Sequence, residues 1–257
     1  MTRAGLIAIG VVVATLRPAA GYELERVGSN GTMNPCGNGP KISWPDASAS
    51  VDLHYLQPAQ FQTYAMQAEQ RWNQAISTFH FASGRGGFCD GSDGVTSMGF
   101  STTDCAGAAF AGQVVSVTRL FFRTDGTMLD ADTTFDVNNA SLVDQALFTQ
   151  IAMHELGHVL GLAHSDACGA NGRGMLMQAV TPLGDPRLSA PTADDIAGAK
   201  AIYGGGSTST DGTVPAGANG CAMASPAAER RLATPALLLP IALMLRRRRA
   251  SRHGDHR

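Results

Sequence analysis

Hydrophobic positions along the chain change between a spacing typical of strands and one typical of helices. Apolar and polar residues alternate at 51–55, which predicts a half-buried strand. From about Pro58 to Phe79, apolar residues recur at helical spacing and predict one amphipathic helix. Val-, Thr- and Phe-rich segments at 113–123 and 133–137 predict two more strands, and 95–100 predicts a short one.

The second half of the sequence predicts two further helices. One runs from about Ser141 to Leu160, with Ser141 as its N-cap. The other spans 192–203, where Thr192 suits the N-cap and Gly204 suits the C-terminal stop. Residues 165–191 lie between them without periodicity and predict a loop.

Composition limits the number of domains and the kinds of partner, but it does not identify a function. The chain has 257 residues, which is enough for one domain with appendages, and its net charge is −2. Because no basic stripe occurs along the sequence, we expect no nucleic-acid partner. We also expect a monomer.

The first 40 residues predict export. Residues 1–21 have the pattern of a signal peptide, because Arg3 precedes an apolar run from Ala4 to Leu16 and small residues follow it. The run is short for a membrane-spanning helix, so a secreted, extracellular protein is favoured over an anchored one. Residues 22–40 are rich in Gly and Asn and predict a short pro-segment or an irregular lead-in.

The C-terminal part has a different composition. Residues 205–220 contain mostly Gly, Ser, Thr and Ala and predict a flexible linker. In the tail, 221–257, Cys221 precedes an apolar stretch at 232–245 and four consecutive arginines. This order resembles bacterial C-terminal sorting tags of the myxobacterial type, which implies transient membrane association and display at the cell surface. The alternative is a disordered basic tail.

The segment from His154 to His164 has the pattern H-E-x-x-H-x-x-G-x-x-H. His154 and His158 are four residues apart, so they share one face of a helix and can hold one metal ion. Gly161 allows a sharp turn that returns His164 to the same ion. Three imidazoles with one open position predict a catalytic zinc, and Glu155 can take a proton from its water. A helix with several satisfied histidines is the alternative, but it does not explain this spacing.

These residues resemble the metzincin metallopeptidases, and most closely the matrixins. Ser165, directly after the third histidine, is typical of matrixins, and residues 175–178 resemble the Met-turn that runs beneath the metal. Met177 fits that turn better than Met175. Residues 192–204 resemble the helix that closes a matrixin domain. Asp195 suits the start of this helix, and the resemblance implies that it also ties the helix to the Met-turn or the mature N-terminus.

The resemblance covers 41–204 and implies an α+β fold with a twisted, mostly parallel five-stranded sheet and three helices. It implies a zinc metalloendopeptidase (EC 3.4.24 type) that hydrolyses extracellular or matrix proteins through zinc-activated water and Glu155. One strand, either 113–123 or 133–137, should border the cleft and pair with extended substrate. The alternatives are a zinc hydrolase of cell-wall peptides and a non-catalytic zinc-binding adhesion module.

Four cysteines lie in or near this region, and export favours disulfides between them. Three pairings exist, of which we favour Cys89–Cys105 with Cys36–Cys168. Residues 34–38 also resemble the cysteine switch of matrixin propeptides, in which the Cys36 thiolate would occupy the open zinc position, although Pro35 replaces the usual arginine.

The same region raises two further metal sites, one for calcium and one for a second zinc. Asp125, Asp130 and Asp132 supply oxygen ligands of the kind that Ca²⁺ prefers. The segment is therefore either a calcium site or simply a turn rich in acidic residues. The second, structural zinc of animal matrixins needs a histidine cluster, whereas only His80 is available here. We therefore expect one catalytic zinc.

Overall fold

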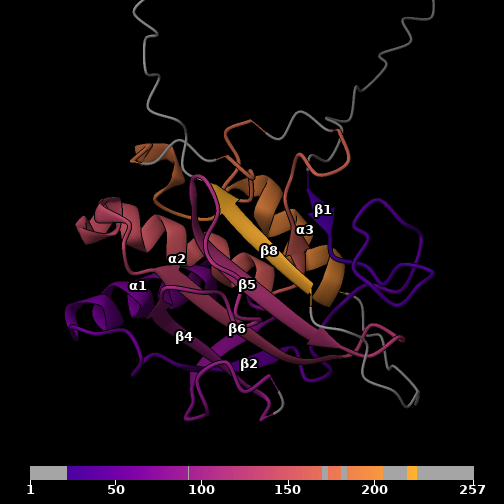
Figure 1. Cartoon of the computed structure of the whole chain (residues 1–257). Helices are drawn as coiled ribbons and strands as arrows, with labels where there is room; N and C mark the ends of the chain where they lie inside the picture. The colour runs from indigo at the N-terminus through magenta and orange to yellow at the C-terminus, as the bar shows by residue number, and fades with distance from the viewer. Residues whose placement is uncertain (1–21, 92, 170–172, 181–183, 205–218, 225–257) are drawn as a thin grey trace, which may run out of the picture. The chain divides into compact units, whose positions relative to one another are not determined.

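The fold of a computed structural model of the chain combines one sheet with three α-helices (Figure 1). The structure describes residues 22–91, 93–169, 173–180, 184–204 and 219–224, the last segment by its backbone. The elements are β1 (Glu23–Leu24), β2 (Ser48–Asp52), α1 (Gln60–Ala75), β3 (His80–Ser83), β4 (Val95–Ser101), β5 (Val114–Phe122), β6 (Met128–Asp136), η1 (Ala140–Val143), α2 (Gln145–Val159), β7 (Leu162–Ala163), η2 (Pro186–Leu188), α3 (Ala193–Tyr203) and β8 (Asn219–Ala224).

The large sheet has the strand order β3-β2-β4-β6-β5-β8. Strand β2 pairs in parallel with β3 and β4, and β4 pairs in parallel with β6. Strand β5 is antiparallel to both of its neighbours, β6 and β8. Strands β2 to β6 therefore form the expected mostly parallel five-stranded sheet, and the α+β prediction is confirmed. Strand β8 is a sixth strand at a position where the sequence predicted the junction of linker and tail.

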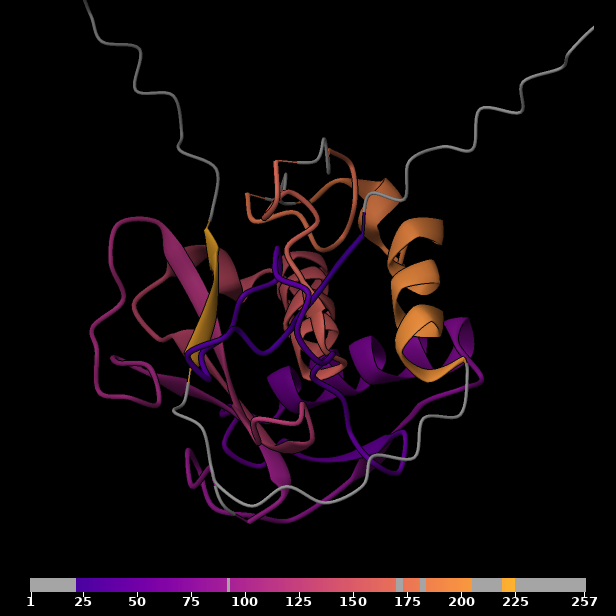
Figure 2. The same cartoon turned by 90° about the vertical axis from the view of Figure 1, so that its right-hand side faces the viewer.

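One face of the sheet carries the core and is covered by α1 and α2 (Figure 2). Four aromatic rings meet there, with the ring centroids of Phe61 and Phe148 5.0 Å apart and those of Phe135 and Phe148 4.8 Å apart. The ring of Phe100 lies 4.9 Å from that of Phe61. Behind them, the Trp72 indole of α1 donates to the Met153 carbonyl of α2 at 2.9 Å. Because both helices are anchored on this apolar face, the position of α2 is fixed against the sheet.

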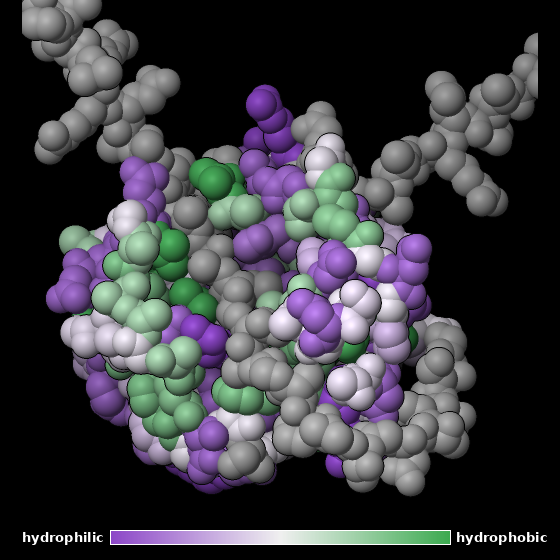
Figure 3. Space-filling view, turned by 45° about the vertical axis from the view of Figure 1, so that its right-hand side comes forward, coloured by the Kyte–Doolittle hydropathy of each residue, from purple (hydrophilic) through white to green (hydrophobic). Residues whose placement is uncertain are grey.

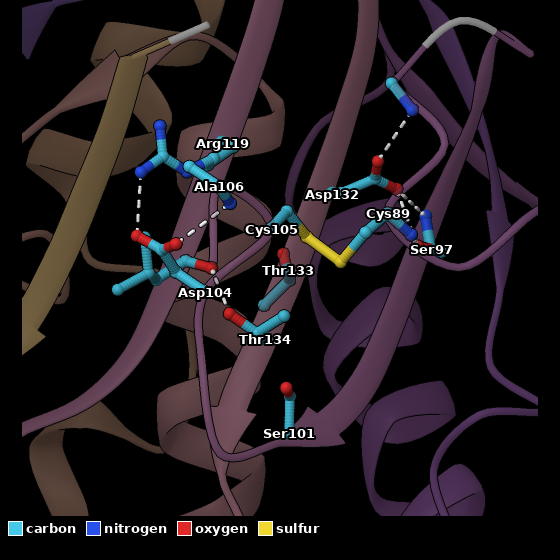
Figure 4. The surroundings of a disulfide bond; sticks show 12 residues. Cys89, Ser97, Ser101, Asp104, Cys105, Ala106, Arg119, Asp132, Thr133 and Thr134 are labelled. Carbon is cyan, nitrogen blue, oxygen red and sulfur yellow. Dashed lines mark hydrogen bonds and ion pairs between the residues drawn. A yellow bond between two sulfur atoms is a disulfide. The ribbon is translucent and has the colours of Figure 1, made fainter. Parts of the chain in front are cut away.

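The opposite face of the sheet is polar and lies under two loops, one between β3 and β4 and one between β4 and β5. Ser97 donates to the Asp132 carboxylate at 2.6 Å, beside the Cys89–Cys105 disulfide (Figure 4). The predicted Cys89–Cys105 pairing is thereby confirmed. Arg119 of β5 forms an ion pair with Asp104 at 2.7 Å, which ties the loop between β4 and β5 to the edge of the five-stranded sheet.

Helix boundaries differ from the predicted ones for local reasons. The helix expected at 58–79 spans Gln60–Ala75, because the chain becomes extended at Ile76. The helix expected from Ser141 begins at Gln145, since the Asp144 side chain accepts from the Leu147 N–H at 3.0 Å and acts as the N-cap. The segment before it forms the short helix η1. Strand β3 was not predicted, because its four residues offer little alternation.

The N-terminal lead-in, which contains the two-residue strand β1, packs against the domain. Strand β1 pairs antiparallel with β7, and the Glu25 N–H donates to the Gly161 carbonyl at 2.8 Å. Leu24 and Val27 are buried in the core. These contacts connect the lead-in directly to the histidine segment.

The surface carries no single apolar face in the view of Figure 3, where hydrophobic and hydrophilic residues are interspersed. The large hydrophobic side chains that are exposed among the described residues are separate in sequence: Met66, Val137, Val143 and Val180. Within that described part, no helix is long and apolar enough to cross a membrane.

Candidate active site

The three predicted histidine ligands converge at one point. His154 and His158 are buried on α2, and His164 follows β7. The Nε2 atom of His158 lies 3.1 Å from that of His154 and 3.2 Å from that of His164. Among the described residues, these three are the group of His, Cys, Asp or Glu side chains whose ligand atoms all lie within 4.8 Å of one another. Their donor set fits a zinc ion with an open position.

The outer nitrogens of the helical histidines are fixed by the backbone. The Nδ1 atom of His154 donates to the Leu176 carbonyl at 2.7 Å, and that of His158 donates to the Leu162 carbonyl at 2.8 Å. These bonds place the proton on Nδ1 and leave the Nε2 lone pair for a metal. Burial lowers the pKa of both imidazoles and of His164, so all three are neutral, as ligands must be.

Gly161 makes the turn that returns the third histidine to the other two. Its φ is +92°, a left-handed value that L side chains rarely adopt. A Cβ at this position would also overlap the Ile42 carbonyl oxygen. Only glycine allows the turn that joins α2 to β7 to pass this close to the Ile42 backbone, which explains its place in the pattern.

Met177 packs against α2, the helix that carries His154 and His158. It is buried, its carbonyl accepts from the Ser165 N–H at 2.8 Å, and its sulfur fills the space beside Gly157 of α2. Asp195 of α3 accepts from the N–H groups of Leu176 at 3.2 Å and Met177 at 3.3 Å.

Asp195 also forms the start of its own helix. Its carboxylate accepts from the Thr192 N–H at 2.8 Å, and the Thr192 hydroxyl accepts from the Asp195 N–H, which is a capping box. Both interpretations of this residue therefore describe real contacts. The closing helix α3 is held to the turn under the site by one buried carboxylate.

Glu155 is buried next to His154 and contacts strand β5. Ser116 donates to its Oε1 and Thr118 to its Oε2, each at 2.5 Å. Burial raises the pKa of the Glu155 carboxyl to about 7, while the two hydroxyl donors act to lower it. Ser116 and Thr118 were not among the predicted site residues. Their alternation with Val115 and Val117 is the available signal, but alone it indicates only a strand with a polar face.

Strand β5 is the strand that borders the site. It carries the two hydroxyls that hold Glu155, whereas β6 lies one strand further into the sheet. This decides between the two segments that the sequence left open, 113–123 and 133–137, in favour of the first. On its outer side β5 pairs with β8, as Figure 1 shows.

Cys36 is not free to act as a switch in this structure. It forms a disulfide with Cys168, with Cα atoms 5.4 Å apart, so its sulfur is bonded and no thiolate is available for the zinc position. The favoured Cys36–Cys168 pairing is confirmed, and the cysteine-switch alternative does not hold for this state. The bond fixes the lead-in to the loop four residues after His164.

The predicted calcium ligands are not gathered in the same way. Asp125 accepts from the Thr127 N–H at 2.9 Å within a turn. Asp130 and Asp132 are buried, and accept from the N–H groups of Gly94 and Gly91. Among the described residues, these aspartates form no ligand group as close as that of the histidines. Calcium binding stays a prediction.

Comparison with known families agrees with this geometry. The family model described as Matrixin (Peptidase_M10) matches residues 48–204, which is more than half of the chain and contains all three histidines, Glu155 and Met177. No curated protein matches the chain. Matrixins are zinc-dependent metallopeptidases, and the histidine cluster fits that cofactor. The chain belongs to the matrixin family.

Proposed function

We propose that this matrixin is an endopeptidase that hydrolyses extended segments of extracellular proteins, with Glu155 as its general base. The observation that carries the proposal is the convergence of three neutral imidazoles beside one buried carboxylate. A structural zinc site would have a fourth protein ligand, whereas the described residues supply three.

Each residue of the site has one task in the proposed reaction. His154, His158 and His164 hold a zinc ion, which acts when bound as a Lewis acid that polarises a carbonyl and lowers the pKa of water. Glu155 accepts a proton from the attacking water and passes it to the nitrogen of the leaving amine. Ser116 and Thr118 orient the Glu155 carboxylate, and Met177 supports the histidines from below without touching substrate.

The substrate is an extended peptide that pairs with the outer edge of β5. Backbone hydrogen bonds to a strand edge supply affinity without fixing sequence, so the preference comes from side-chain pockets. A peptide in that place passes Ser116 and Thr118, the residues that contact Glu155.

Export from the cell is part of the proposal. The apolar run from Ala4 to Leu16 supports it from sequence, and two disulfides support it because such bonds persist in oxidising compartments. The signal segment 1–21, the linker 205–218 and the tail 225–257 lie outside the described residues. Display at the cell surface through the sorting tail is proposed from its sequence order alone.

The test uses the purified chain and its Glu155→Gln variant, with zinc content and hydrolysis measured on both. The wild type should contain about one zinc and cleave a denatured protein, lose activity with a chelator and regain it with zinc. E155Q should keep zinc but lose at least about a thousand-fold in rate, because the general base is gone.

The same assay decides between the rival functions. Equal, undetectable hydrolysis by wild type and E155Q on every substrate would favour a zinc-binding adhesion module. Cleavage of purified peptidoglycan without cleavage of denatured protein would favour a cell-wall hydrolase. Either result would overturn the proposed endopeptidase.

A further inference from the structure

Strand β5 would be the outer edge of the sheet without β8. It is the last of the five strands in the order β3-β2-β4-β6-β5, and its other side is paired with β6. An edge strand presents a row of unpaired N–H and C=O groups, which is a template for an added strand. In this chain the added strand is the chain's own segment, Asn219–Ala224.

The register of β8 places its centre beside the catalytic carboxylate. Met223 pairs with Ser116, Ala222 with Val117 and Cys221 with Thr118. Ser116 and Thr118 are the residues whose hydroxyls hold Glu155. Strand β8 also approaches the active-site helix α2, with Cα atoms of the two elements within 8 Å of each other. Its backbone therefore runs along the part of the edge that serves the site.

We propose that residues 219–224 occupy the place on the β5 edge where an extended substrate would pair, so that the intact chain partly blocks its own peptidase site. The inference rests on the proposed function, because it concerns the regulation of that site. Both the segment and a substrate would use the same backbone groups of β5. Two strands cannot pair with one edge at once, so the site opens when the segment leaves.

The covalent connection between residues 219–224 and the domain explains how this segment stays bound to β5 and how it is released. Residues 205–218 join α3 to β8, so the segment competes with substrate as an intramolecular ligand. A short tether of this kind gives an effective concentration on the order of millimolar, which exceeds ordinary substrate levels. Cleavage of the tether removes this advantage. The activating event is then a cut between the domain and the segment, or removal of the segment with the tail.

A pair of prolines in β8 tests the pairing in the full-length chain. Consecutive N–H groups of a strand point to opposite sides, so Ala222→Pro with Met223→Pro removes a ladder N–H whichever residue donates it. The control is Ala227→Pro with Ala228→Pro, which lies beyond β8. The readouts are hydrogen exchange of the β5 amides without substrate, and the rate of hydrolysis of a denatured protein.

The double variant in β8 should exchange faster along Val114–Phe122 and hydrolyse roughly ten-fold faster than the wild type, while the control matches the wild type. A synthetic peptide of residues 217–226 carrying C221S should then inhibit the double variant competitively. Cys221→Ser in the full chain should change neither readout, because the pairing is made by the backbone.

Three outcomes would overturn the inference: unchanged exchange of β5 in the double variant, activation by C221S alone, or cleavage of the intact chain within 219–224. Cleavage within 219–224 would make the segment a substrate instead of an inhibitor, and mass spectrometry of the intact chain detects this cleavage. Failure of the proposed function looks different. In that case β5 exchange rises as expected, but neither protein hydrolyses any substrate even though zinc is bound.

Discussion

The histidine side of the site, formed by α2, β7 and the turn at Met177, differs from its strand side, formed by β5 and β8, in where its residues come from. The three ligands and Glu155 lie within eleven consecutive residues. The strand side joins residues 114–122 to residues 219–224, about a hundred positions later in the sequence. Its geometry depends on strand pairing rather than on local spacing.

This difference shows which part of a peptidase site is rigid and which part can pair with different extended chains. On the histidine side, His154 and His158 are buried and each imidazole is held by a backbone carbonyl, so one changed residue breaks it. The strand side is made of backbone groups on an edge, which accept any extended chain. A site of this kind keeps its chemistry fixed while its occupant changes.

Removing one of the three histidine ligands should have the largest effect on hydrolysis. In His158→Ala, zinc binding is lost with one of the three imidazoles, and hydrolysis should fall at least about a thousand-fold. Zinc content by plasma mass spectrometry and the hydrolysis rate are the measurements. His80→Ala, at an exposed position on β3, is the matched control and should match the wild type. Retention of tightly bound zinc by H158A would break the account of the histidine side.

The packing behind the histidine helix should show a pH-dependent stability. Glu69 of α1 is buried, its Oε1 has no hydrogen-bond partner, and burial raises its pKa to about 7. The folded state therefore holds the proton more tightly than the unfolded state, whose pKa is near 4.5. Stability contributed by this group is present below pH 4.5 and is lost as pH rises towards 7.

Glu69→Gln removes this dependence because glutamine does not ionise. From pH 4.5 to pH 8, the variant should gain up to about 3 kcal/mol relative to the wild type in the free energy of unfolding. Urea unfolding of both metal-free proteins at several pH values measures the difference. A constant difference across that range would show that the Glu69 carboxyl is hydrated, and that the space behind α2 is not dry.

Removing the contact between the histidine side and the strand side should have the smallest effect on hydrolysis. Ser116→Ala with Thr118→Ala removes both hydroxyls that hold Glu155, so the carboxylate loses two charge-assisted hydrogen bonds and its fixed orientation. The expected result is about a ten-fold lower kcat with KM and zinc content unchanged, which corresponds to about 1.4 kcal/mol. Thr102→Ala, at an exposed position, is the control. An equal kcat would show that the two sides act independently.

Sequence reasoning reached most of the histidine side because its signals are local. The spacing of His154, His158 and His164 required a helix and a turn, and the structure supplies both. Met177 is buried beside Gly157 of α2, and the two favoured disulfides form. In these cases the residue type and its spacing from the other site residues along the chain leave few possible arrangements.

On the strand side the sequence predicted the strand at 113–123 but not its contacts with Glu155 or its pairing with 219–224, for physical reasons. Ser116 and Thr118 alternate with valines, and that pattern is the same whether the polar face meets water or a buried carboxylate. Segment 219–224 lies in a Gly- and Ala-rich region that has no strand periodicity, so composition indicated linker and tail. Its pairing comes from an available edge on β5, which no local property of the segment encodes.

The central claim is that three imidazoles hold a zinc ion and that no protein sulfur does. X-ray absorption at the zinc edge of the zinc-loaded, full-length chain tests it most directly. The account predicts three histidine nitrogens at about 2.0–2.1 Å and a light-atom fourth ligand. A sulfur ligand at about 2.3 Å would contradict it, because a cysteine would then close the site in place of a paired strand.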